Sequence, residues 1–99
     1  MLSLSFVGDY CPSGHAINGD DPLQLMCAGC QAAIGKADLA IANLESCLVE
    51  DGRQSDRIMA VAERDCGVVA KSGFDVLTLA NNHILDCGPG SLQFSRNYL

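Results

Sequence analysis

The chain has 99 residues, of which 48% are hydrophobic, and twelve acidic residues against six lysines and arginines give a net charge of −6. This length allows one small domain. The acidic balance argues against binding to a nucleic-acid backbone, which requires clustered Lys and Arg. No apolar run approaches the roughly 18 residues of a membrane-spanning helix, and residues 1–10 lack the basic start of a signal peptide. We therefore expect no nucleic-acid partner, no membrane segment in this chain and, for the sequence as given, a cytoplasmic protein.

Predicted strands and helices alternate along the chain. The stretch LSLSFVG, residues 2–8, predicts a strand, and a Gly- and Pro-rich loop follows it. Pro22 favours a helix start, so an amphipathic helix is expected over residues 23–37. Residues 38–46 predict a strand buried on both faces, and residues 47–56 a polar excursion. Further strands are expected at 57–62 and 74–80, and further helices at 63–73 and 89–99. The order is typical of an α/β fold with a mostly parallel sheet and flanking helices.

Polar side chains follow three of the predicted strands. Asp9 comes directly after the first strand, Asn43 and Glu45 lie at the end of the second, and Asn82 and His83 follow the last. Because the carboxyl ends of parallel strands meet at one edge, these groups are expected to face one crevice. Two carboxylates about 4 Å apart repel by roughly 4 kcal/mol at an effective dielectric of 20, and a divalent cation between them removes that cost. Singly, each residue also has a purely structural explanation as a turn or cap.

Three segments carry a family resemblance: FVGD, ADLAIANLES and GFDVLTLANNHILDCG, in this order. Together they closely resemble the bacterial capsule-synthesis protein CapA family, which is associated with poly-γ-glutamate capsule biosynthesis and belongs to the calcineurin-like metallophosphoesterase superfamily. The resemblance extends from Ser5 to about Leu92. It implies a layered α/β domain around one or two divalent metal ions of unknown identity. It also implies a small-molecule or polymer phosphate substrate, and envelope or capsule synthesis components as partners.

The resemblance also implies a role for each polar residue. Metal ligands would be Asp9, Glu45 and Asn82, and His83 would be the catalytic residue that donates to the phosphate or its leaving group. Asn43, Asn81 and Asp86 would orient these groups. The implied reaction is metal-assisted hydrolysis of a phosphate ester. The alternative is a binding or scaffold module of an envelope-polymer machinery that keeps the fold without catalysis.

The sequence departs from the family pattern in two places. Cys11 stands where the superfamily often has a histidine, and no histidine motif follows His83. We therefore expect residues 1–99 to be a single partial domain, truncated at its C-terminus, with an open sheet edge. Weak metal binding and no appreciable phosphatase activity are expected of the isolated chain. Family members are often membrane-anchored or extracellular.

Six cysteines include the pair Cys27 and Cys30 in the motif CAGC. Redox pairs of this spacing lie at the start of a helix, and zinc sites use two such pairs. The predicted helix over residues 23–37 places this pair in mid-helix on the apolar face. We therefore expect buried, reduced core thiols, with redox chemistry as the alternative.

Overall fold

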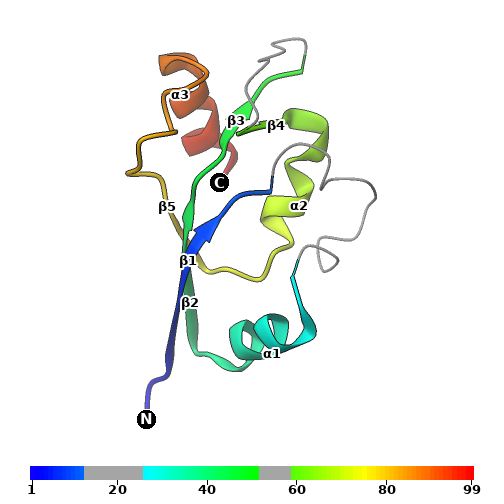
Figure 1. Ribbon diagram of the computed structural model, residues 1–99, viewed down its shortest axis with the longest axis vertical. Coiled ribbons are helices and arrows are strands. Elements are labelled where there is room, and N and C mark those ends of the chain that lie inside the picture. Colours follow the sequence, from blue (N-terminus) through cyan, green and yellow to red (C-terminus); the bar gives the residue numbers. More distant parts are fainter. Residues whose placement is uncertain (13–25, 52–58) are drawn as a thin grey trace.

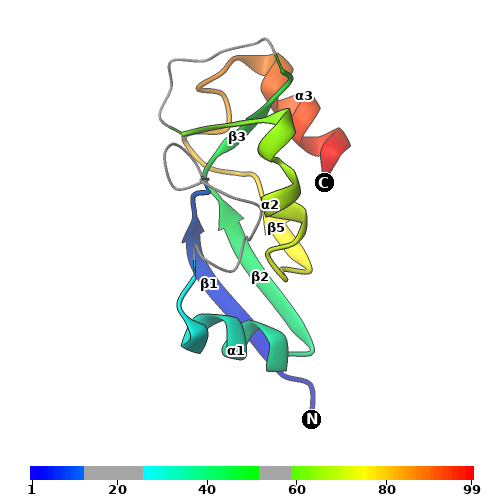
Figure 2. The same ribbon diagram turned by 90° about the vertical axis from the view of Figure 1, so that its right-hand side faces the viewer.

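The computed structural model of the protein describes residues 1–12, 26–51 and 59–99. Three parallel strands form its main sheet: β1 (Leu4–Tyr10), β2 (Leu39–Leu44) and β5 (Val76–Thr78), in the order β1-β2-β5. A second parallel sheet pairs β3 (Cys47–Val49) with β4 (Ala60–Ala62). Figures 1 and 2 show that β2 leads directly into β3, so the two sheets follow one another along the molecule. The predicted α/β class with a mostly parallel sheet is confirmed.

Helices lie against both sheets. α1 (Ala28–Lys36) precedes β2, the 3₁₀ turn η3 (Glu63–Asp65) and α2 (Gly67–Ala70) follow β4, and α3 (Pro89–Tyr98) ends the chain. In Figure 1, where the main sheet is seen edge-on, α1 and α2 lie to its right and α3 lies beside β3. Gly88 has φ +87°, a left-handed conformation that favours glycine, and Pro89 occupies the first turn of α3. The predicted helix over residues 89–99 is thus confirmed.

The strands differ from the prediction in three places. Residues 47–56 were expected to be a polar excursion, but Cys47, Leu48 and Val49 form β3 and are buried. Three residues are too few to show a strand periodicity, and the charges of the following segment mask the pattern. The strand expected to be buried on both faces, β2, instead alternates between buried and half-buried residues. β5 is limited to Val76–Thr78 within the predicted range 74–80.

The helix expected over residues 23–37 is present as α1 (Ala28–Lys36), but the predicted mid-helix position of the cysteine pair is wrong. The part expected at residues 23–25 and its start at Pro22 lie outside the described residues. Of the strand expected at 57–62, only residues 57–58 lie outside them, and the strand is present as β4 (Ala60–Ala62). The backbone at Cys27 is extended, with φ −65° and ψ 154°, so that α1 begins at Ala28. Both Cys27 and Cys30 are exposed rather than buried. Gly29 between them weakens helix formation, which favours a start at this point rather than upstream.

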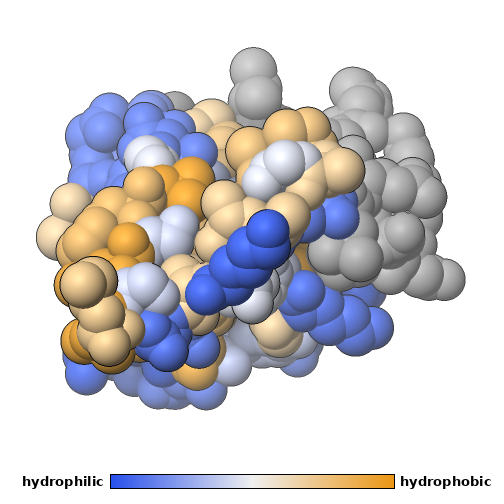
Figure 3. Space-filling model, turned by 90° about the horizontal axis from the view of Figure 1, so that it is seen from below, coloured by the Kyte–Doolittle hydropathy of each residue, from blue (hydrophilic) through white to orange (hydrophobic). Residues whose placement is uncertain are grey.

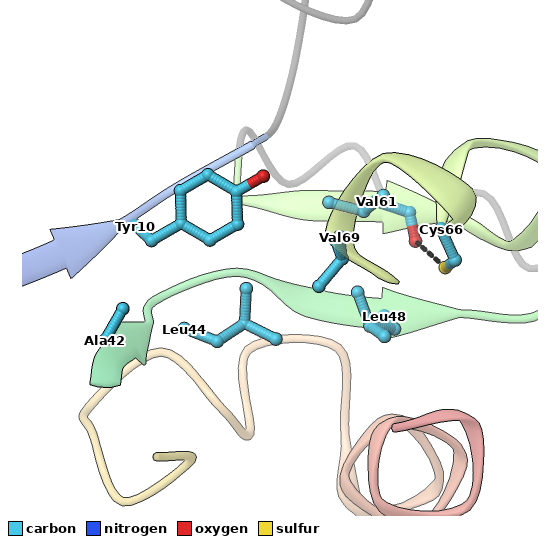
Figure 4. Close-up of a cluster of buried hydrophobic side chains, with 7 residues drawn as sticks. All are labelled: Tyr10, Ala42, Leu44, Leu48, Val61, Cys66 and Val69. Atoms are coloured by element: carbon cyan, nitrogen blue, oxygen red, sulfur yellow. Dashed lines mark hydrogen bonds between the residues drawn. The ribbon is translucent and has the colours of Figure 1, made fainter. Parts of the chain in front are cut away.

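One hydrophobic core connects the two sheets. Its buried members come from β1, β2, β3, β4 and α2, and Figure 4 shows their side chains between these elements: Tyr10, Ala42, Leu44, Leu48, Val61, Cys66 and Val69. Tyr10 also stacks at a tilt against Phe74, with ring centroids 5.2 Å apart. Burial raises the pKa of the Cys66 thiol to about 12, so this cysteine is an inert core residue. The core fixes β2 on its Ala42 and Leu44 face and leaves Asn43 on the opposite face.

The N-terminal half of β1 lies outside this core. Phe6 is 71% exposed, and Leu4 and Val7 are also exposed. Seen from below, the surface combines hydrophobic areas with hydrophilic ones (Figure 3). None of the helices in the described part of the chain is long and apolar enough to cross a membrane.

Candidate functional site

A bulge in β1 sets the direction of the Asp9 side chain. Phe6 pairs with Ile41 but Asp9 pairs with Asn43, so three steps along β1 match two steps along β2. Side chains alternate between the faces of a strand, so Asp9 would point away from Asn43 without this extra residue. Asn43 in turn pairs with Thr78 of β5. Asp9, Asn43 and Thr78 therefore form a row across the three strands on one face of the sheet.

Asn43 is the centre of the hydrogen bonds in this row. Its Nδ2 donates to Asp9 Oδ1 at 2.8 Å. Its Oδ1 accepts from Asn81 Nδ2 at 3.1 Å and from Thr78 Oγ1 at 3.3 Å. Because both ends of the amide have partners, its orientation is set, and the carboxylate of Asp9 is held by a donor from the neighbouring strand.

Asn81 connects the sheet to the loop that follows β5. Its Nδ2 also donates to the backbone carbonyl of Leu44 at 2.8 Å, at the end of β2. Its Oδ1 accepts the backbone N–H of His83 at 3.0 Å. An Asn side chain that bonds the backbone two residues later shapes a tight turn. Asn81 thus places His83 next to the end of β2.

The ring of His83 is held on both nitrogens. Nδ1 lies 2.9 Å from Asp86 Oδ2, and Nε2 lies 3.1 Å from Asn82 Nδ2. An ionised carboxylate accepts hydrogen bonds and an amide NH₂ only donates them. In the neutral ring, therefore, Nδ1 carries the proton and donates to Asp86, whereas Nε2 accepts from Asn82. This tautomer leaves the Nε2 lone pair as the reactive position of the imidazole.

Carboxylates surround His83. The hydrogen bond to Asp86 raises the pKa of His83 above its usual value, and the charges of Asp86, Glu45 and Asp9 add to this effect, whereas partial desolvation opposes it. Glu45 Oε1 lies 3.9 Å from Nε2. Three negative side chains near one imidazole create a region that attracts cations.

The donor atoms at this site are of the chemical types that bind divalent cations. Two carboxylates, an amide oxygen and an imidazole nitrogen are ligands that such cations use: Asp9, Glu45, Asn82 and His83. Across residues 1–12, 26–51 and 59–99, however, no three His, Cys, Asp or Glu side chains are grouped closely enough to hold a metal ion. A ligand set drawn from these residues must therefore include an amide oxygen, which Asn82 supplies when its amide turns over. The metal-binding roles of Asp9, Glu45 and Asn82 stay predictions.

The structure brings together all seven residues proposed from the sequence, through hydrogen bonds or short contacts, at the carboxyl end of the sheet: Asp9, Asn43, Glu45, Asn81, Asn82, His83 and Asp86. Sequence reasoning missed Thr78, which adds a hydroxyl to the row. The signal was its place directly opposite Asn43, which becomes visible only when β2 and β5 are aligned. Cys11, which stands where the superfamily often has a histidine, contacts the Ser46 hydroxyl at 3.3 Å and the Met59 sulfur at 3.4 Å.

Comparison with known proteins gives one family match. The family model described as bacterial capsule synthesis protein PGA_cap matches residues 3–99. No curated protein sequence and no solved structure matches the chain. The match covers both sheets and all seven residues of the polar site.

Proposed function

Because the chain belongs to the bacterial capsule synthesis protein family PGA_cap, we propose that its strand-end site binds a divalent cation and acts on a phosphate ester used in capsule synthesis. The observation that carries this proposal is the hydrogen-bonded path from Asp9 through Asn43 and Asn81 to His83. Such a path aligns a carboxylate, an amide and an imidazole around one position. Envelope or capsule synthesis components are the proposed partners.

Asp9, Glu45 and Asn82 are the proposed ligands of the cation. When bound, the cation supplies Lewis acidity toward a phosphoryl oxygen and offsets the negative charge of both carboxylate and phosphate. Without a cation, the acidic site would repel a phosphate group, since Asp9, Glu45 and Asp86 all lie near His83. The proposal therefore requires that phosphate binding depend on the cation.

His83 is the proposed proton donor. The contact with Asp86 fixes Nδ1 and raises the pKa of the imidazole, so a larger fraction of the ring is protonated near neutral pH. Its Nε2 lies 3.9 Å from Glu45 Oε1. A protonated Nε2 can donate to a phosphate oxygen or to the leaving group. Asn43 and Asn81 bind no substrate in this scheme; they position Asp9 and the His83 loop.

A non-catalytic binding module is the second candidate function. It is favoured by the lack of a group of three His, Cys, Asp or Glu side chains suited to a metal among the residues that the structure describes. A scaffold that binds a phosphate-bearing polymer needs the row of polar groups but no complete catalytic metal centre. Both candidates share the site and differ in turnover.

Inorganic phosphate is the probe that tests the proposal. We expect the ³¹P signal of phosphate to broaden when Mn²⁺ and the protein are both present, beyond the broadening by Mn²⁺ alone, because the protein holds both together. Asp9→Asn should remove this excess broadening. The control Asp38→Asn makes the same change where Asp38 bonds Ser3 before β2, at the other end of the sheet, and should leave the broadening unchanged.

Turnover of a phosphodiester then separates the two candidates. Hydrolysis of bis(p-nitrophenyl) phosphate that needs Mn²⁺ and disappears in His83→Ala would establish the phosphoesterase and correct the expectation of an inactive chain. Cation-dependent phosphate binding without hydrolysis would favour the binding module. Equal broadening by the wild type and Asp9→Asn would refute both.

A further inference from the structure

Cys27 and Cys30 form a close pair of exposed thiols that the proposed function does not use. Their Sγ atoms lie 3.4 Å apart. Cys27 occupies the position just before α1, and Cys30 lies in the first turn of this nine-residue helix. Free cysteines at this separation need only a small rotation to form a disulfide, whose sulfur atoms are about 2 Å apart.

The two thiols are chemically unequal. The backbone N–H of Cys30 and its thiol stabilise a thiolate at Cys27, which lowers the pKa of Cys27. The neighbouring Cys27 in turn raises the pKa of Cys30. Unpaired N–H groups at a helix N-terminus favour negative charge there. Cys27 is thus the better nucleophile of the two, and Cys30 stays protonated until Cys27 has reacted.

A cavity lies beside Cys30. Cys30 lines a cavity of about 260 Å³ together with Met26, Ile34 and Phe74, which give it an apolar wall. The buried cysteines differ, since burial raises the pKa of both Cys47 and Cys66 to about 12. Among the described thiols, only this pair combines exposure, a lowered pKa at one member and a second thiol 3.4 Å away.

We propose that Cys27 and Cys30 form a dithiol site that exchanges with disulfides, with Cys27 as the attacking and Cys30 as the resolving residue. The Cys27 thiolate attacks one sulfur of a disulfide, forms a mixed disulfide and releases the other sulfur as a thiolate. The Cys30 thiolate then attacks Cys27 Sγ and releases the second thiolate. The protein pair is oxidised by two electrons, the incoming disulfide is reduced to two thiols, and the two protons lost by the cysteines neutralise the released thiolates. The exchange uses none of the residues proposed for the phosphate chemistry, although Asp9 lines the same cavity as Cys30.

Glutathione disulfide is the probe for this site. Trypsin leaves residues 1–36 as one peptide, because Lys36 is the first basic residue, and this peptide also contains Cys11. The experiment therefore uses the full chain in a Cys11→Ser background. After incubation with glutathione disulfide, we expect this peptide to lose two hydrogens and to carry no glutathione.

Single variants assign the two roles. Cys30→Ser should trap glutathione on Cys27, whereas Cys27→Ser should show little adduct on Cys30. Both residues are exposed, so the variants should keep the wild-type circular dichroism spectrum. Three results would overturn the proposal: an unchanged peptide, equal adducts in the two variants, or a disulfide that joins Cys47 to Cys87 instead.

Discussion

At the scale of single residues, the doubled asparagine before His83 is explained by two separate tasks. Asn81 uses both ends of its amide within the fold, on Asn43, Leu44 and the His83 backbone. Asn82 instead contacts the His83 ring. One asparagine would suffice for a turn. The second contacts the imidazole, and its amide can present either a donor or an acceptor to the ring.

The pKa of His83 gives a direct test of this arrangement. In protein freed of cations by a chelator, an NMR titration of the imidazole should give a pKa above the usual 6.5, mainly because of the Asp86 hydrogen bond. A raised folded-state pKa stabilises the fold at low pH, and this contribution is lost as pH rises through that pKa. Asp86→Asn should lower the pKa toward its usual value and reduce the difference in stability between pH 6 and 8. An unchanged titration in Asp86→Asn would contradict the assigned contact.

At the scale of elements, the β1 bulge and the packing of α3 on β3 organise the structure. The bulge between Phe6 and Asp9 brings Asp9 onto the Asn43 face. α3 reaches β3 through Ser95, whose buried Oγ accepts the backbone N–H of Leu48 at 3.0 Å. Neither feature was predicted from the sequence. Gly8 within LSFVGDY is a sign of the bulge, but the predicted strand ended at this glycine instead of continuing through it. A buried serine looks like any polar residue of a surface helix.

Ser95→Ala should destabilise the protein by about 1–3 kcal/mol, because it leaves the buried N–H of Leu48 without an acceptor. Urea unfolding followed by circular dichroism measures this change. Ser5→Ala in β1 is the matched control, and we expect it to shift the free energy of unfolding by less than about 0.5 kcal/mol. Equal effects of the two substitutions would show that the Ser95 contact contributes little.

At the scale of the whole molecule, the parallel α/β class was the most predictable property and the register of the strands the least. The alternation of apolar segments and helix starts was enough to predict a parallel α/β sheet, and the carboxyl-end rule was enough to gather Asp9, Asn43 and His83 at one edge. The start of α1 was mispredicted because the apolar periodicity continues upstream of Cys27. The hydrogen bonds of Asn43 to Asp9, Thr78 and Asn81 depend on the register of the strands, which cannot be read from a single sequence.

Cation binding tests the central claim most directly, since the proposed cation-dependent binding of phosphate requires it. Electron paramagnetic resonance of free Mn²⁺, measured against protein concentration, gives the dissociation constant. We predict that the wild type and Asp38→Asn bind Mn²⁺ alike, and that Asp9→Asn weakens binding by at least about tenfold because one charged ligand becomes neutral. Equal affinities of the wild type and Asp9→Asn would contradict a cation site at the strand ends.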